Sequence, residues 1–346
     1  RVVRGMAPIF GTSGEIVALG GSGTGGLQAA VASSFSPGER VLAAPVGIFG
    51  ERLAAIARAF GLEVELLETR YGSALDPEAL AARLRADREQ RIAGVLLTHN
   101  ETSTGVQNDL GALAAAFGEH PALRIVDSVS GLGATPFAMD AWGYDIVVTA
   151  SQKVLAAPPG LALVAASARA WERIAAARGP RFYFDLAKAR QFAHDGQTPW
   201  TPPLSILAAL EVGLERYHAA GAAAVYARLE RYARAIRSFA ETLGIELFSR
   251  PGAHSVTVVA LRVPPGLEAG TIRTRLRERG IVFGGGQGPM KGKILRIGTM
   301  GDLSDADLLA GLEAFETVLC ELGLNAADGR GLAAAHRVLS ATPVTA

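Results

Sequence analysis

Short apolar runs alternate with helix-like segments along the first half of the chain. The continuously apolar runs predict strands at residues 16–19, 40–44, 63–67, 92–98, 123–127, 145–149 and 161–165. Helical periodicity predicts helices between them at 25–34, 51–60, 77–86 and 110–117. This alternation favours a mostly parallel seven-stranded sheet, and strands without polar alternation indicate that helices cover both of its faces.

The pattern changes after Pro202. Two long helices are predicted at 204–218 and 223–243, then a strand, helix and strand at 255–263, 269–279 and 293–297, and a last helix at 305–322. A chain of 346 residues is long enough for two domains. We therefore expect a large α/β domain over 1–220, a smaller α+β domain over 221–325, and a tail without clear periodicity over 326–346.

Composition narrows the classes of function. A net charge of +1 without a Lys/Arg cluster argues against a nucleic-acid or membrane partner. No apolar run is long enough to span a bilayer, and no signal peptide opens the chain. The single cysteine, Cys320, excludes a disulfide within one copy and fits a reducing compartment. These features predict a cytoplasmic protein, and no metal site is expected.

A glycine-rich loop follows the first predicted strand, at residues 20–26 (GGSGTGG). Glycines let backbone N–H groups approach an anion, and the N-terminus of the next helix favours negative charge. The hydroxyls of Ser22 and Thr24 add donors, so the loop predicts a phosphate site. It also satisfies G-x-G-x-x-G, but the second strand ends without the carboxylate that a dinucleotide fold places on the ribose. An NAD-type oxidoreductase thus stays a weaker alternative.

Two charged residues follow later strands. Asp127 ends the strand at 123–127, and Lys153 follows the strand at 145–149. Both should lie at the carboxyl edge of the sheet, where ligands bind in open parallel sheets. Burial beside apolar segments lowers a lysine's pKa and makes it a usable amine. An amine and a carboxylate at one site are what pyridoxal 5′-phosphate needs, for its aldehyde and its ring nitrogen respectively.

Nine short motifs, in order, resemble one enzyme family. They are GSGTG at 21–25, GIFGER at 47–52, THNETSTG at 98–105, VDSVS at 126–130, GYD at 143–145, SQK at 151–153, PPGL at 158–161, TPP at 201–203 and LRIG at 295–298. Over nearly the whole chain this sequence resembles the class V, fold type I aminotransferases that use pyridoxal 5′-phosphate. It is most similar to the branch of alanine–glyoxylate, serine–glyoxylate and serine–pyruvate aminotransferases.

The resemblance implies roles around the cofactor ring. Lys153 matches the lysine that forms the Schiff base and moves the proton. Asp127 matches the partner of the ring nitrogen, and Phe49 the aromatic residue stacked on the ring. Thr102 matches the hydroxyl near the cofactor's phenolic oxygen, and Val129 the apolar contact below the ring.

Further roles concern the phosphate and the substrate. Gly23, Thr24 and Gln152 match phosphate ligands, alongside the hydroxyl already noted in the glycine loop. Thr201 is similar to a threonine that reaches the phosphate of the other subunit, which implies a homodimer with shared sites. Arg296 matches the arginine that binds the substrate carboxylate, a task suited to a planar, bidentate donor.

Together these features predict ping-pong transamination between alanine or serine and glyoxylate or pyruvate. Transamination of 2-aminoethylphosphonate with pyruvate stays open, whereas cysteine desulfuration is disfavoured because Cys320 lies in a helical run. A non-catalytic binding protein is disfavoured because the three charged residues of the motifs are all present. The family's leading segment is expected to be missing here, and Trp200, where some relatives have a phosphate-binding tyrosine, receives no role.

Overall fold

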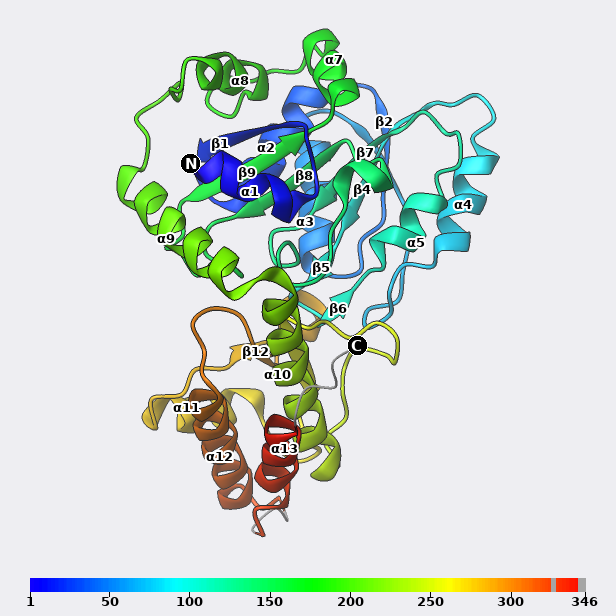
Figure 1. The fold of residues 1–346 in the computed structure, drawn as a ribbon. Helices are drawn as coiled ribbons and strands as arrows, with labels where there is room; N and C mark the ends of the chain where they lie inside the picture. Colours follow the sequence, from blue (N-terminus) through cyan, green and yellow to red (C-terminus); the bar gives the residue numbers. More distant parts are fainter. Residues whose placement is uncertain (325–327, 342–346) are drawn as a thin grey trace.

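A seven-stranded sheet forms the centre of the larger part of the molecule (Figure 1). The computed structural model describes residues 1–324 and 328–341. In spatial order the strands are β1 (Glu15–Gly20), β9 (Leu161–Ala166), β8 (Ile146–Ala150), β7 (Leu123–Asp127), β4 (Ile92–Thr98), β2 (Arg40–Ala43) and β3 (Glu63–Leu66). Only β9 runs against the other six. The prediction of a mostly parallel seven-stranded sheet is confirmed.

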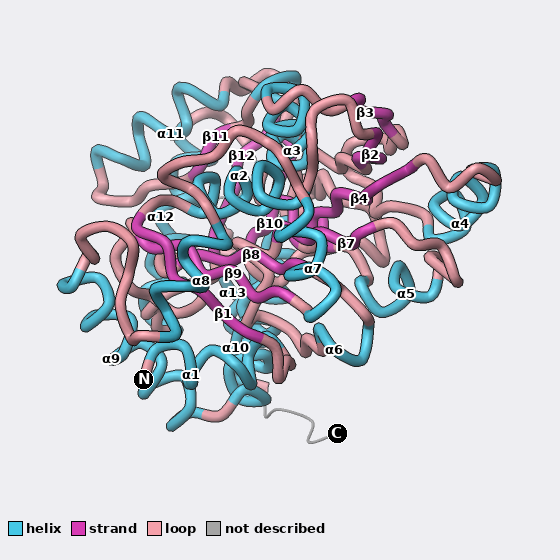
Figure 2. The backbone as a smooth tube through the Cα atoms, turned by 90° about the horizontal axis from the view of Figure 1, so that it is seen from above, coloured by secondary structure: helices cyan, strands magenta, loops and turns pink. Residues whose placement is uncertain are grey.

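Helices cover both faces of this sheet, as Figure 2 shows from above. One face packs on α2 (Gly23–Ser34), α3 (Ile48–Ala59), α7 (Ala168–Ala176) and α8 (Leu186–His194). The other packs on α1 (Val2–Phe10), α4 (Pro77–Ala86), α5 (Leu110–Ala115), α6 (Met139–Trp142) and α9 (Leu204–Ala220). Six of the seven strands contribute side chains to both apolar clusters, so their sequences are largely apolar rather than alternating. The edge strand β3 differs, because its sequence EVEL alternates and it has no buried residue.

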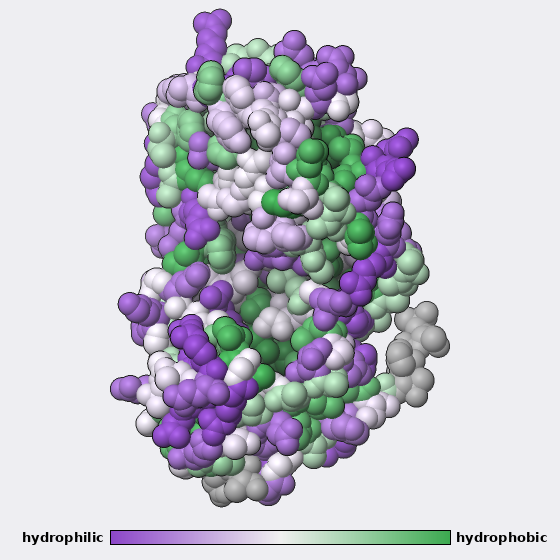
Figure 3. Space-filling model, turned by 90° about the vertical axis from the view of Figure 1, so that its left-hand side faces the viewer, coloured by the Kyte–Doolittle hydropathy of each residue, from purple (hydrophilic) through white to green (hydrophobic). Residues whose placement is uncertain are grey.

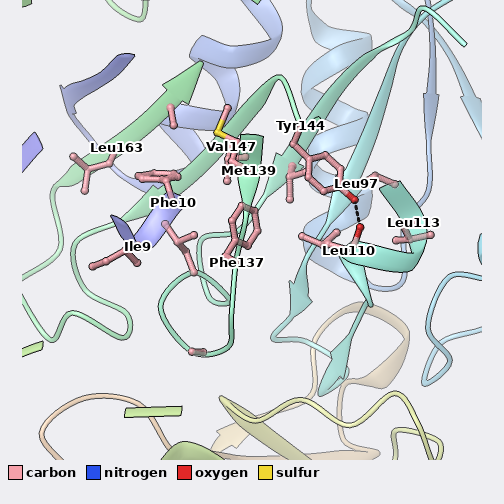
Figure 4. Close-up of a cluster of buried hydrophobic side chains, with 14 of the residues drawn as sticks. Ile9, Phe10, Leu97, Leu110, Leu113, Phe137, Met139, Tyr144, Val147 and Leu163 are labelled. Carbon is pink, nitrogen blue, oxygen red and sulfur yellow. Dashed lines mark hydrogen bonds between the residues drawn. The ribbon is translucent and has the colours of Figure 1, made fainter. Parts of the chain in front are cut away.

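The second of these clusters contains a buried phenol (Figure 4). Tyr144, which precedes β8, is 1% exposed and donates a hydrogen bond to the backbone oxygen of Leu110 at 2.7 Å. A phenol in an apolar core needs such a partner, because an unpaired buried hydroxyl costs roughly 1–3 kcal/mol. Phe10 and Phe137 pack in the same cluster, so α1 is anchored to this face of the sheet.

The smaller part is built on a three-stranded antiparallel sheet, in the order β10 (Val258–Arg262), β12 (Ile294–Gly298) and β11 (Gly284–Gly285). Its separate apolar core comes from α10 (Ala222–Thr242), α11 (Ala269–Glu278), α12 (Asp305–Glu321) and α13 (Arg330–Ser340). A 3₁₀ turn, η1, spans Gly288–Met290. The α+β character is as predicted, and the domain boundary at residue 220 stays a prediction.

The expected tail over 326–346 needs a correction. Residues 330–340 form α13, which packs against α10 and buries Ala334, Ala335 and Leu339. Several of its apolar residues are small alanines, which carry little hydrophobic signal, and this made its period hard to recognise. Residues 326–327 and 342–346 lie outside the described part of the chain.

A small hairpin joins the two sheets. Strands β5 (Asn100–Glu101) and β6 (Val106–Gln107) follow β4 directly. The hairpin carbonyl of Gly105 accepts a hydrogen bond from Ser255 N at 3.0 Å. Its turn therefore contacts the segment that leads into β10, and the carboxyl edge of the large sheet lies close to the small one.

Four helices of the larger part were not predicted: α1, α6, α7 and α8. Helix α6 has four residues and the other three have nine each, which is too short for a strong periodic signal. Among the helices of the described residues, none combines the length and the hydropathy needed to cross a bilayer. Seen from the side, the surface is hollowed between the two parts of the molecule, with hydrophobic side chains in the hollow (Figure 3).

Candidate active site

The glycine loop and the two predicted catalytic residues each follow or end a strand of the large sheet. The glycine loop follows β1, Asp127 ends β7, and Lys153 follows β8. Strands β1, β7 and β8 run in the same direction, since β1 and β8 both pair antiparallel with β9. Their carboxyl ends therefore meet at one edge of the sheet, although the residues are far apart in the sequence.

The glycine loop turns directly into α2. Ser22 is its N-cap, and its Oγ accepts from the Gly25 N–H at 3.4 Å. The helix begins at Gly23, two residues earlier than predicted, because this cap starts it. A Cβ on Gly23 would lie 2.7 Å from a methyl of Val129, so only glycine fits there. The loop and the segment after Asp127 are thus in direct contact.

Asp127, the last residue of β7, is 5% exposed. Its carboxylate accepts a hydrogen bond from the Val129 N–H at 2.9 Å. Burial raises the pKa of Asp127 to about 7, and the negative charge of Glu101 adds to the rise. That hydrogen bond and the positive charges of Lys153 and Arg52 act in the opposite direction. A cation placed at this carboxylate would favour its ionised form.

Lys153 is held in the loop between β8 and β9. Burial lowers the pKa of Lys153, and the nearby positive charge of Arg296 lowers it further, whereas Asp127 raises it. The two predicted catalytic residues therefore lie close enough for their charges to interact. The preceding residue, Gln152, has a buried amide oxygen without a hydrogen-bond partner in the described part of the chain.

Phe49 lies at the start of α3, and its backbone is held by a buried carboxylate. Glu101 Oε2 accepts hydrogen bonds from the N–H groups of Phe49 and Gly50, each at 3.0 Å. Ser103 donates to the other carboxylate oxygen from its hydroxyl at 2.6 Å and its N–H at 3.0 Å. A Cβ on Gly47 would lie 2.5 Å from Glu101 Cγ, which explains that glycine.

Glu101 is thus a positioning residue that sequence reasoning missed. Burial raises the pKa of Glu101, and the hydrogen bonds from Ser103, Gly50 and Phe49 oppose the rise. Residues 101 and 103 belong to the THNETSTG motif, which was read only for its threonine at 102. A glutamate among small polar residues beside a strand end could have signalled a helix cap contributed from a distant segment.

Arg296 lies in β12 of the small sheet and points back to the hairpin. Its Nε donates to the carbonyl of Gly285 and its Nη1 to that of Thr102, both at 2.9 Å. Among residues 1–324 and 328–341, no carboxylate forms an ion pair with it, and its Nη2 has no hydrogen-bond partner. Burial lowers the pKa of Arg296, which the charge of Glu101 partly offsets.

The side chain of Thr102 donates a hydrogen bond to Ser130 Oγ at 2.8 Å. Ser130 also donates to the Asn100 carbonyl at 3.0 Å, so the hairpin is tied to the segment after β7. A second missed residue, His99, lies on the far side of this segment and bonds Ser128 Oγ through Nδ1 at 2.8 Å. Burial lowers the pKa of His99 to about 4, so it is neutral at pH 7.

Thr201 stands apart from the other predicted residues. It is exposed, on the segment 198–203 between α8 and α9. This segment and Gly20 line one small cavity. Trp200 stacks on Tyr183 with a ring distance of 5.5 Å, and its indole N–H donates to the carbonyl of the same tyrosine at 2.9 Å. The structure thus accounts for Trp200 by local packing.

Comparison with known families decides the class. The family model described as aminotransferase class-V matches residues 6–293. The chain belongs to the class V aminotransferase family. This aminotransferase has a solved structural neighbour in the pyridoxamine–pyruvate aminotransferase of Mesorhizobium loti, with a TM-score of 0.92 and 32% identity over 98% of this chain and 87% of that one. The fold type I architecture and the branch that the motifs predicted are thus confirmed.

Three curated relatives cover the aminotransferase nearly end to end. It is 40% identical to the L-aspartate–glyoxylate aminotransferase of Paracoccus denitrificans, over 94% of this chain and 83% of that one. It is 34% identical to the serine–glyoxylate aminotransferase of Methylorubrum extorquens, over 97% and 86%. It is also 40% identical to a protein of Anabaena cylindrica named soluble hydrogenase 42 kDa subunit, over 98% and 89%.

The family and these neighbours imply pyridoxal 5′-phosphate as the cofactor of the aminotransferase, and the residues at the sheet edge fit it. Asp127 offers a buried carboxylate with only one hydrogen bond, and Lys153 an amine with no ion pair within the described residues. The side-chain amide of Gln152 can donate its N–H groups to an anion, and the glycine loop ends in the capped start of α2. The carboxylate suits the ring nitrogen of the cofactor, the amine suits its aldehyde, and the donors of Gln152 and the loop suit its phosphate.

Proposed function

We propose that this aminotransferase moves the amino group of alanine or serine to glyoxylate or pyruvate in two half-reactions. The observation that carries the substrate class is Arg296. Its guanidinium is half-buried, contacts two carbonyls, and has no carboxylate partner among the described residues. An α-carboxylate, present in every amino acid and 2-oxo acid, would satisfy the remaining donors with charge-assisted hydrogen bonds.

Each residue at the edge has a distinct task in this proposal. When bound, pyridoxal 5′-phosphate supplies an aldehyde for the amino group and a ring that accepts the electrons of the broken C–H bond. Lys153 Nζ is the attachment point, and once released it takes the α-proton of the amino acid. Burial lowers its pKa, which favours the neutral amine that a base requires. Asp127 keeps a proton on the ring nitrogen by its negative charge.

The remaining predicted residues hold the cofactor. Phe49, fixed at the start of α3 through Glu101, covers the ring from one side, and Val129 contacts it from the other. Thr102 lies beside the phenolic oxygen, whereas Ser22, Gly23, Thr24 and Gln152 bind the phosphate. Support comes from the position of these residues after strands of the large sheet and from the contact between the glycine loop and the segment after Asp127.

We further propose a homodimer in which Thr201 reaches the phosphate of the second copy. The support is its exposure on the segment 198–203, where it makes no hydrogen bond with the described residues. Sedimentation should give a dimer. A monomer that binds the cofactor and turns over substrate would contradict this arrangement.

Two measurements test the proposed function. First, borohydride reduction of the protein with added cofactor, followed by peptide mapping, should place the pyridoxyl group on Lys153. Second, alanine, serine, aspartate and 2-aminoethylphosphonate are compared as donors to glyoxylate and to pyruvate. We expect the highest kcat/KM for alanine or serine. A label on another lysine overturns the attachment point, and preference for aspartate or the phosphonate overturns the substrate class.

A further inference from the structure

The phosphate ligands proposed above share one property: every one of them is neutral. They comprise three hydroxyl-bearing residues, a glycine and an amide: Ser22, Thr24, Thr201, Gly23 and Gln152. A phosphate ester carries about −1.5 to −2 charges at pH 7. The α2 N-terminus supplies only roughly half a positive charge. The proposed phosphate subsite therefore lacks a full counter-charge.

Arg52 lies beside this subsite, three residues along α3 from Phe49. Its Nη1 donates a hydrogen bond to Thr24 Oγ1 at 3.3 Å. Its guanidinium carbon lies 4.7 Å from the centre of the Phe49 ring, within the range of a cation–π contact. The same positive charge also acts on Asp127 across the site. Arg52 thus contacts one proposed phosphate ligand and the proposed ring cover.

Arg52 has no carboxylate partner among the described residues. Its neighbour Glu51 instead accepts a hydrogen bond from the Tyr71 hydroxyl. By contrast, many arginines of this chain form ion pairs, as Arg83 does with Glu65. An arginine that is held by a hydroxyl and an aromatic ring keeps its full charge available to a ligand.

The contact with Thr24 also sets the direction of that hydroxyl. Because the Thr24 oxygen accepts from Arg52, its own proton is free to be donated elsewhere. The first N–H groups of α2 have no partner within the helix, so they point the same way out of its N-terminus. An anion bound at the loop would meet these two kinds of donor, and the positive charge of Arg52 would lie next to them.

We propose that Arg52 is the cation of the phosphate subsite, which neutralises the cofactor phosphate and aligns Thr24 as a donor to it. This inference rests on the proposed function, because it takes pyridoxal 5′-phosphate as the ligand. It adds a charged group to a set of neutral ligands, and it explains why α3 carries both an aromatic residue and an arginine one turn apart.

The experiment compares two ligands that differ only in the phosphate. Dissociation constants of pyridoxal 5′-phosphate and of pyridoxal are measured by absorbance for wild type, Arg52→Gln, Arg52→Lys and Arg58→Gln, after the bound cofactor is removed. Arg58 is an exposed arginine of the same helix and serves as the matched control. Circular dichroism of each variant reports whether it is folded.

Arg52→Gln should weaken pyridoxal 5′-phosphate about 10- to 100-fold, the loss expected for a charged hydrogen bond. Pyridoxal should change less than about threefold, since it lacks the anion. Arg52→Lys should lose less, because it keeps the charge without the planar fork. Arg58→Gln should match wild type. The proposal is overturned if Arg52→Gln weakens the binding of pyridoxal 5′-phosphate and of pyridoxal by factors that agree within about threefold. It is equally overturned if neither ligand binds more weakly.

This outcome is separable from the proposed function. If the donor comparison fails but pyridoxal 5′-phosphate still binds in an Arg52-dependent way, the substrate class is wrong and the role of Arg52 stands. If the donor comparison succeeds and Arg52→Gln binds both ligands as wild type does, the function stands and the role of Arg52 is wrong.

Discussion

Asp127 and Arg296 are both charged residues in apolar strands, one in each sheet, but their surroundings treat the charge differently. Asp127 is 5% exposed and receives one backbone hydrogen bond, and its pKa rises to about 7. Arg296 is half-buried and donates to two carbonyls. Burial lowers the pKa of Arg296, yet a guanidinium is basic enough to stay charged at pH 7.

The comparison shows two ways in which a charged residue of a strand can bind a ligand. The carboxyl of Asp127 can become neutral when it lacks a cation, so its charge depends on what binds beside it. The guanidinium of Arg296 cannot, so its charge persists and attracts an anion. One carboxylate acts on both: Glu101 raises the pKa of Asp127 and that of Arg296. Four predictions follow from this contrast.

Replacing Asp127 with Asn should have the largest effect. The amide keeps the shape but cannot carry the negative charge that retains a proton on the ring nitrogen. We expect kcat to fall about 10²- to 10³-fold, the loss typical of a removed electrostatic contact in a dry site. The test is single-turnover kinetics with cofactor binding measured in parallel. Near-normal turnover would contradict the role of Asp127 as the partner of the ring nitrogen.

Replacing Arg296 with Ala should weaken amino-acid binding at least about 100-fold, because two charged hydrogen bonds of about 1.5–3 kcal/mol each are lost. Arg296→Lys should recover only part of this, since an ammonium cannot form the fork. Cofactor affinity should survive in both variants. An unchanged KM for every donor would show that another residue binds the carboxylate.

Replacing Glu101 with Gln tests the group shared by both sites. The amide still accepts from Phe49 and Gly50, but without charge, so α3 should hold Phe49 less firmly. We expect cofactor affinity to drop about tenfold, near the value of one charged hydrogen bond. Glu51→Gln, an exposed glutamate on the same helix, is the control. Equal affinity in the two variants would contradict a positioning role for Glu101.

The fourth prediction concerns the pH dependence of folding of the protein stripped of cofactor. The pKa of Asp127 is about 7 when folded against about 3.9 unfolded, so its contribution to stability is full below pH 4 and is lost as pH rises towards 7. His99, with a pKa of about 4, acts in the opposite sense between pH 4 and 6.5.

The measurement is therefore a difference between two proteins. Relative to wild type, the free energy of unfolding of Asp127→Asn should rise by about 1 kcal/mol per pH unit between pH 4 and 7. Urea unfolding at four pH values is sufficient. A difference that does not change with pH would mean that Asp127 keeps an ordinary pKa in the folded chain.

The strand–helix alternation was enough to predict the large sheet, because continuous apolar runs have few other solutions. The alternation could not predict the strand order. That order depends on the pairing of β1 with β9, and these strands are too far apart in the sequence for a local pattern to indicate it. The motifs predicted Asp127, Lys153 and Arg296 at one site, and the structure places them close together. Glu101 was missed because its task, the start of a helix 50 residues earlier, exists only in three dimensions.

The antiparallel pairing of β1 with β9 has a consequence for the order of assembly during synthesis. Strand β1 precedes the other six strands of its sheet along the chain, yet it pairs only with β9, which follows about 140 residues later. The glycine loop at its end therefore stays without its place in the sheet until nearly all of the large sheet has been translated. Such long-range closure is slow. A nascent chain halted before residue 161 should leave β1 unpaired, open to a chaperone or to a neighbouring chain.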